Sequence, residues 1–142
     1  MELGVSEMVP LFTERTQVKW SAQKNQQRHQ RWRGLIISAC EQCGRNRLPG
    51  LQPAVRFGDW VGASNGGERL LFTPDAPVSV ELGGKPDRVE LVIGPEGGFT
   101  AEEVITATAQ GYRAVRLGPR VLRTETAPLA ALAVVQSLTG DF

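Results

Sequence analysis

The amino-acid sequence predicts an α/β domain whose mainly parallel sheet is flanked by helices. Short apolar runs alternate with longer segments of helical character, which is the pattern of parallel strands joined by crossover helices. In addition, two glycine-containing loops, at residues 94–98 and 118–126, each follow an apolar run and precede a helix start. Because ligands bind at the carboxyl ends of strands in open α/β sheets, the two loops predict one shared pocket.

The first part of the chain contains one interrupted strand and one long helix. Residues 8–12 read as a strand, but Pro10 predicts an irregular or edge position. Residues 23 to about 44 read as a helix, which Gly44 can end. Its expected buried stripe follows a spacing of three to four residues and comprises Trp32, Leu35, Ile36, Ala39 and Cys40. Further along, we expect a short helix at 56–61, a turn at 64–67 and a strand at 69–73.

The first glycine-containing loop follows an apolar strand at residues 89–93. Gly94, Gly97 and Gly98 can take positive φ and let a ligand approach the backbone. The loop matches neither the Walker pattern nor the dinucleotide-binding pattern. A plain strand-to-helix connection is therefore an open alternative, and the glycine content alone favours it.

The helix after this loop has clear start and stop signals. Thr100 followed by Glu103 fits a capping box, so the helix should begin at Ala101. It should end before Gly111, which is a favourable residue just beyond a helix.

The second loop follows a strand expected at residues 114–117 and carries Arg120, Arg123 and Glu125. Thr124 or Thr126 can cap the helix that follows. This last helix is apolar over much of its circumference, which predicts deep packing against the sheet. Charged residues in such a loop are ordinarily solvent-exposed and have no role in a site, so this alternative stays open for them.

Composition indicates a single cytoplasmic domain without a metal centre. The chain has 142 residues, of which 41% are hydrophobic, and this suffices for one core. No segment approaches the roughly 18 apolar residues of a membrane span, and the first residues show no signal-peptide pattern. Two cysteines and one histidine are too few for a four-ligand zinc site.

Positive charge is concentrated in one stretch although the whole chain carries only +1. Residues 15–47 contain Glu41 as their one acid, and their basic residues are Arg15, Lys19, Lys24, Arg28, Arg31, Arg33, Arg45 and Arg47. Clustered basic residues are typical of a surface that meets a phosphate backbone. A solvated helix face explains the same charges equally well.

The motif sequences resemble those of the RsmE family, the bacterial 16S ribosomal RNA uridine-N3 methyltransferases of the SPOUT superfamily. The first motif is Ile93-Gly94-Pro95-Glu96-Gly97-Gly98-Phe99, and the second is Leu117-Gly118-Pro119-Arg120-Val121-Leu122-Arg123-Thr124-Glu125-Thr126-Ala127. Upstream segments agree as well: Glu2-Leu3-Gly4-Val5, Pro10-Leu11-Phe12-Thr13-Glu14-Arg15 and Ala39-Cys40-Glu41-Gln42-Cys43-Gly44-Arg45-Asn46. The resemblance therefore runs nearly end to end.

The resemblance implies a SPOUT methyltransferase domain at 1–142 with a C-terminal deep trefoil knot, a homodimer, and the small ribosomal subunit with its 16S ribosomal RNA as partner. It also implies an N-terminal PUA-like domain followed by a first strand and most of a first helix, and we expect Met1-Glu2-Leu3-Gly4 to correspond to the end of that helix. The cofactor implied is S-adenosyl-L-methionine, and the residues expected to bind it are Leu71, Phe72, Thr73, Ile93, Gly94, Pro95, Gly97, Gly98, Leu117, Gly118, Val121, Leu122, Arg123, Thr126 and Ala127. The residues expected to meet RNA are Arg15, Arg28, Arg31, Arg45, Asn46, Arg47 and Arg120.

The implied chemistry gives roles to a few charged residues. Uridine N3 carries a proton that must be removed, or the resulting anion must be stabilised. A carboxylate serves as base when burial or an apolar wall raises its pKa, and Glu125 and Glu96 are the acids in the motif loops. Arg123 or Arg120 can instead stabilise charge on the uracil oxygens.

Two alternatives remain open. One is a SPOUT methyltransferase that acts on transfer RNA. The other is a noncatalytic RNA- or nucleotide-binding domain in which the glycine-containing loops hold phosphate. Glu96 weakly disfavours the phosphate-binding alternative, because an acid would repel a triphosphate but tolerate a cationic sulfonium.

Overall fold

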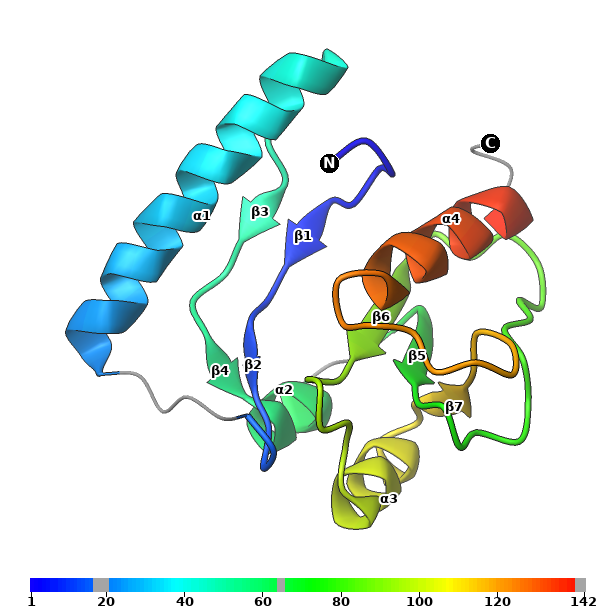
Figure 1. Ribbon diagram of the computed structural model, residues 1–142. Helices are drawn as coiled ribbons and strands as arrows, with labels where there is room; N and C mark the ends of the chain where they lie inside the picture. The colour runs from blue at the N-terminus through cyan, green and yellow to red at the C-terminus, as the bar shows by residue number, and fades with distance from the viewer. Residues whose placement is uncertain (17–20, 64–65, 140–142) are drawn as a thin grey trace.

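The computed structural model describes residues 1–16, 21–63 and 66–139 (Figure 1). The expected basic residue Lys19 and the first half of the turn expected at 64–67 lie outside the described residues. The elements in chain order are β1 (Glu7–Met8), β2 (Leu11–Phe12), α1 (Ala22–Cys43), β3 (Gly50–Leu51), β4 (Val55–Arg56), α2 (Phe57–Ala63), β5 (Glu68–Phe72), β6 (Val89–Ile93), α3 (Ala101–Ala109), β7 (Arg113–Val115) and α4 (Ala127–Thr139).

Parallel pairing dominates the sheets of the described chain, which confirms the predicted α/β class. The largest sheet has the order β6-β5-β7, and in its register Leu71 lies opposite Val92 and Ala114. Two smaller pairs, β1 with β3 and β2 with β4, are parallel as well. Pro10 separates β1 from β2, so the strand expected at 8–12 is interrupted where the sequence predicted.

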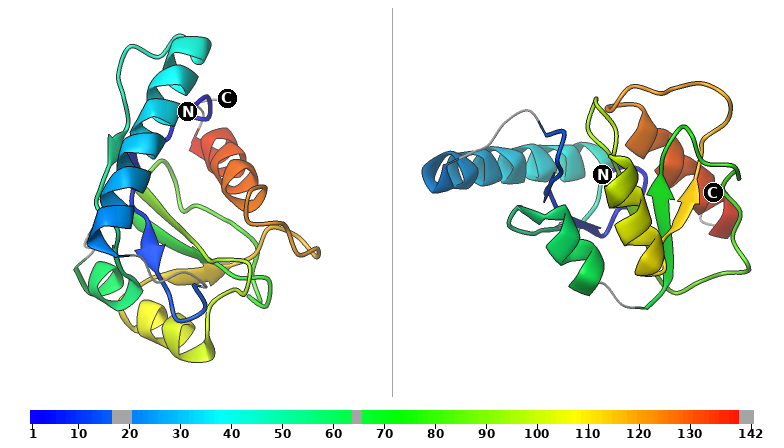
Figure 2. Two further views of the ribbon diagram at one scale, coloured as in Figure 1. Left: turned by 60° about the vertical axis from the view of Figure 1, so that its left-hand side comes forward. Right: turned by 90° about the horizontal axis from the view of Figure 1, so that it is seen from below.

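Helices cover both faces of the β6-β5-β7 sheet, as the two views of Figure 2 show. On one face, α2 and α3 contribute to a core cluster that includes Leu71 and Val92. On the other face, α4 packs on a second cluster that includes Leu70 and Phe72. Successive residues of β5 thus enter opposite cores, as the two-residue period of a strand requires.

Helix α1 lies at the side of the molecule and has the predicted length (Figure 1). The Ser21 side chain caps its start, and Gly44 ends it in the left-handed region with φ of 74°. Ile36 and Cys40 are buried as expected. The prediction for Leu35 was wrong, because this side chain is 59% exposed. A helix that packs along one side covers only part of its apolar surface within one chain.

The other two long helices were predicted with different success. Helix α3 has the full capping box between Thr100 and Glu103, and it ends before Gly111. Helix α4 begins at Ala127 but buries fully only Ala131 and Val135. Its apolar residues on the outer side stay exposed, so the expected deep packing holds for one face only.

Candidate active site

A cavity of about 260 Å³ lies where β5, β6 and β7 end. Three loops form it, each leaving the carboxyl end of one parallel strand. The lining residues are Arg15, Phe72, Thr73, Pro74, Asp75, Ile93, Gly94, Pro95, Glu96, Gly97, Gly98, Phe99, Arg116, Leu117, Gly118, Arg120, Val121, Leu122, Thr124 and Ala127. The pocket predicted from the two glycine-containing loops is thus present as a single cavity.

The structure requires glycine at different positions of the first loop for different reasons. Only Gly98 of the three has positive φ, at 66°, and its N–H donates to Pro95 O at 2.8 Å. Gly94 and Gly97 can take positive φ as well, but in this structure they do not. A Cβ on Gly94 would lie 3.2 Å from the Phe99 ring, so close packing explains this glycine. Phe99 itself is buried against Phe57, with ring centroids 5.2 Å apart.

The second loop is tied to the start of α4 and leaves several side chains exposed. Gly118 has φ of 74°. The carbonyl of Arg123 accepts from the N–H groups of Thr126 and Ala127, both at 2.9 Å. Val121 is 79% exposed at the cavity, an unusual position for a large apolar side chain.

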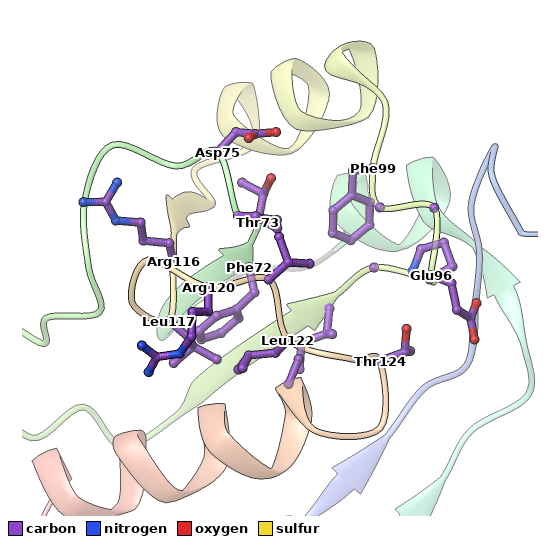
Figure 3. Close-up of a pocket in the computed structure, with 18 of the residues that line it drawn as sticks. Phe72, Thr73, Asp75, Glu96, Phe99, Arg116, Leu117, Arg120, Leu122 and Thr124 are labelled. Atoms are coloured by element: carbon purple, nitrogen blue, oxygen red, sulfur yellow. The ribbon is translucent and has the colours of Figure 1, made fainter.

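Charged side chains of both signs surround the cavity (Figure 3). Asp75 and Arg116 lie toward one end of the view and Glu96 toward the other. The guanidinium of Arg116 donates to Ala76 O at 3.3 Å, and that of Arg15 donates to Gly97 O at 2.7 Å. Backbone carbonyls therefore already hold two arginines of the lining.

Most residues expected to bind the cofactor line this cavity, and three do not. Leu71 is fully buried in the core under α2 and α3, because strand alternation turns it away from the side where Phe72 points. Arg123 and Thr126 are exposed beside the cavity without lining it. Sequence reasoning missed Asp75, Phe99 and Arg116. Asp75 and Arg116 lie within three residues of the ends of β5 and β7, and Phe99 closes the first motif, and these positions were the available signals.

The expected catalytic residues are divided between the cavity and the open surface. Glu96 lines the cavity, whereas Arg123 and Glu125 do not. Arg123 Nη1 lies 3.9 Å from Glu125 Oε1, and their side chains are 86% and 73% exposed. Within this chain, neither carboxylate has the burial that the role of base requires.

The residues expected to meet RNA are in three different environments. Arg28 and Arg31 lie exposed on α1, and Asn46 and Arg47 are exposed just after it. Arg45 is half-buried and donates to Met1 O at 3.0 Å and Val5 O at 2.8 Å, so it fastens the start of the chain.

The remaining two, Arg15 and Arg120, line the cavity.

The described residues contain no group of three or more His, Cys, Asp or Glu side chains suited to hold a metal ion. Cys40 is buried and Cys43 is half-buried, and both are free thiols. None of the described helices combines the length and the apolar character needed to cross a membrane.

Comparison with known proteins gives consistent matches along the whole chain. Ribosomal RNA small subunit methyltransferase E of Buchnera aphidicola subsp. Schizaphis graminum is 36% identical, covering 99% of this chain and 58% of that protein. The protein of the same name from Synechocystis is 37% identical, covering 96% of this chain and 46% of that protein. The chain therefore spans about half the length of such relatives.

Solved structures agree with the sequence comparison. The ribosomal RNA small subunit methyltransferase E of Neisseria gonorrhoeae, solved with bound S-adenosyl methionine, superposes with a TM-score of 0.90 at 36% identity. That match covers 96% of this chain and 56% of the other. A protein of Legionella pneumophila, solved with the cofactor SAM, gives a TM-score of 0.91 at 42% identity, covering 96% of this chain and 57% of the other.

The resemblance to the RsmE family is thereby confirmed. The family model for the RNA methyltransferase domain matches residues 1–136. The chain belongs to the RNA methyltransferase domain family.

Proposed function

We propose that this chain is the cofactor-binding unit of an S-adenosyl-L-methionine-dependent methyltransferase that modifies N3 of a uridine in 16S ribosomal RNA. The observation that carries the proposal is the cavity at the carboxyl ends of β5, β6 and β7. It forms in a chain whose structural neighbours are methyltransferases solved with this cofactor.

The chemistry of the cavity fits a flat, partly cationic cofactor. Phe72, Leu117 and Leu122 offer apolar contact for an adenine ring (Figure 3). The carboxylates of Asp75 and Glu96 suit the ammonium and sulfonium charges of the cofactor. Among the described residues the lining contains no lysine, and two of its arginines are bound to carbonyls, which disfavours a triphosphate.

The proposed reaction moves a methyl group from sulfur to nitrogen. When bound, the cofactor supplies that methyl group as part of a sulfonium. The uridine N3 proton must leave as the N–C bond forms, and Glu96 is the carboxylate of the motifs that lines the cavity. Arg120 also lines the cavity, and we assign to it the stabilisation of charge on the uracil oxygens. Glu96, Arg123 and Glu125 are all exposed in this chain, so a catalytic role for any of them requires cover by RNA or by a second subunit.

The exposed basic residues of α1 support ribosomal RNA as the partner. Arg28, Arg31 and Arg47 are exposed along α1 and just after its end. Such charges bind a phosphate backbone without reading sequence, and the binding weakens as salt is raised. We place the reaction in the cytoplasm, where small ribosomal subunits are assembled and modified.

A homodimer is part of the proposal. Leu129 and Leu138 of α4 are 57% and 46% exposed, and Leu35 and Ile37 of α1 are 59% and 36% exposed. A two-fold pair that covered these side chains would reduce exposed apolar surface, and such pairs are the commonest oligomers. The deep trefoil knot is a further expectation from the RsmE resemblance, and an experimental structure with a continuous trace from β5 to α4 would test it.

Calorimetry and a methyl-transfer assay test the proposal. The chain should bind S-adenosylhomocysteine and should not bind ATP. With labelled cofactor and unmodified small ribosomal subunits, digestion and mass spectrometry should detect N3-methyluridine. The Glu96→Gln variant should still bind S-adenosylhomocysteine, which lacks the sulfonium charge, but transfer methyl about 10²-fold or more slowly. Binding of ATP instead of S-adenosylhomocysteine would replace the proposal with a nucleotide-binding module, and product in transfer RNA would change the substrate.

A further inference from the structure

A turn at residues 13–16 lies against the first glycine-containing loop, although the bonded residues are 82 to 89 positions apart in sequence. The turn is fixed internally. The N–H of Thr16 donates to Thr13 O at 3.1 Å, and the N–H of Thr13 donates to Thr16 Oγ1 at 3.0 Å. It directly follows β2, which pairs with β4. The turn is therefore held in one conformation by its own hydrogen bonds and by the strand pair that precedes it.

The carboxylate of Glu103 joins this turn to the start of α3. Glu103 is 7% exposed, and a buried carboxylate is costly unless hydrogen bonds compensate it. Its Oε1 accepts from the N–H of Glu14 at 2.9 Å, and its Oε2 accepts from the N–H of Thr100 at 2.8 Å. One side chain therefore caps the helix and anchors a segment from the other end of the chain.

Arg15 makes the second connection, directly to the first glycine-containing loop. Its Nη1 donates to Gly97 O at 2.7 Å and to Phe99 O at 3.2 Å. These two carbonyls flank Gly98, whose φ of 66° bends the loop. Hydrogen bonds from a charged donor are stronger than neutral ones. Arg15 therefore fixes the backbone on both sides of the bend.

Gly97 is explained by the same contact. It does not have positive φ, so conformational freedom is not the reason for a glycine there. A Cβ on Gly97 would lie 3.2 Å from Arg15 Cβ and 3.4 Å from Arg15 Cδ. The glycine lets the arginine lie directly on the loop backbone.

We propose that Arg15, supported by Glu103, is a positioning residue that holds loop 94–99 in the conformation that binds the methyl donor. The inference rests on the proposed function. When the binding conformation is only partly populated, the apparent affinity for the ligand equals the intrinsic affinity multiplied by the populated fraction. Affinity therefore falls even when the contacts to the ligand are unchanged. Arg15 accordingly acts in cofactor binding through the loop that it holds.

Calorimetry with S-adenosylhomocysteine tests the proposal on the 142-residue chain. Arg15→Ala should weaken binding about 10-fold, and Arg15→Lys, which keeps one charged donor, should fall between Arg15→Ala and the wild type. Arg56→Ala is the matched control, since Arg56 is an exposed arginine on β4 that does not line the cavity. It should bind like the wild type. Equal affinities of Arg15→Ala and wild type would overturn the inference.

Hydrogen exchange supplies a readout that does not depend on the ligand. The Gly98 amide, bonded to Pro95 O, should exchange faster in Arg15→Ala, while amides in the buried part of α3 keep their rates. A uniform acceleration throughout the chain would indicate a purely structural role and would contradict the proposal. If Arg15→Ala does not fold, Arg15→Lys is used for both measurements. Failure of the wild type to bind S-adenosylhomocysteine would refute the proposed function, whereas the exchange of Gly98 would still decide whether Arg15 holds the loop.

Discussion

Replacing Gly98 separates backbone strain from obstruction of the cavity. Gly98 has φ of 66°, and a Cβ built there would meet no atom within 4 Å. Gly44 offers a matched control, because it has φ of 74°, equally open space, and a position at the end of α1. A left-handed conformation costs an ordinary residue roughly 1–2 kcal/mol, and the lower entropy of the unfolded chain offsets part of it. Each glycine-to-alanine change should therefore destabilise the fold by about 1 kcal/mol.

The two variants should differ in their affinity for the cofactor. Gly98→Ala places a methyl group at the cavity, whereas Gly44→Ala adds the same group far from it. The added side chain would overlap the bound ligand. Overlap of this kind costs about 1–3 kcal/mol, which corresponds to about 10- to 100-fold in affinity for the ligand. Gly98→Ala should fall at the lower end of this range and Gly98→Val at the upper end or beyond.

Thermal unfolding and calorimetry with S-adenosylhomocysteine measure the two effects on the same samples. Both alanine variants should lose similar stability, seen as a melting temperature lower by about 3–4 °C. Only the Gly98 variants should lose affinity. A folded Gly98→Val protein with wild-type affinity would remove this loop from the cofactor site, and loss of affinity in Gly44→Ala would show that strain alone explains the result.

Three further outcomes follow from the described contacts. Leu71→Ala should destabilise the fold by about 2–5 kcal/mol, measured by denaturation, with little change in cofactor affinity, because Leu71 is in the core and not in the cavity lining; a specific loss of affinity would contradict this. Tyr112→Phe should lower the free energy of unfolding by about 1.5–3 kcal/mol in the same assay, because the Tyr112 hydroxyl donates to the buried carboxylate of Glu90. That carboxylate also accepts from Trp60 Nε1 at 2.7 Å. Unchanged stability would show that the bond from Tyr112 is dispensable. Leu129→Asp should shift sedimentation at micromolar concentration from dimer to monomer, and a wild-type chain that already sediments as a monomer would refute the dimer.

Local signals in the sequence determined the elements and the place of the pocket. The capping box from Thr100 to Glu103 and the terminal glycine at 44 fixed helix boundaries, because each signal acts through bonds within a few residues. Pro10 marked the break between β1 and β2 for the same reason. The glycine-containing loops located the cavity, since the ends of parallel strands gather at one edge of a sheet.

The face that each residue presents was decided only by tertiary structure. Leu71 and Phe72 are both apolar and adjacent, yet one is in the core under α2 and α3 and the other reaches the cavity. In a strand covered on both sides, both faces read as apolar, so the sequence carries no sign of which side holds the ligand. Leu35 was misjudged for a related reason, because a helical stripe does not show how much of it another element covers.

Contacts between distant segments were likewise invisible in the sequence. Glu103 was identified as a capping residue, but its second oxygen binds the backbone of Glu14, 89 positions away. Arg15 was counted among the basic residues of an RNA surface, and its hydrogen bonds to the carbonyls of Gly97 and Phe99 were not anticipated. The sequence by itself determined the local elements and the strand-end site, through short-range bonds and periodicity. Only the tertiary structure decided which distant turn supports that site, because packing brings the two segments together and no local pattern encodes their meeting.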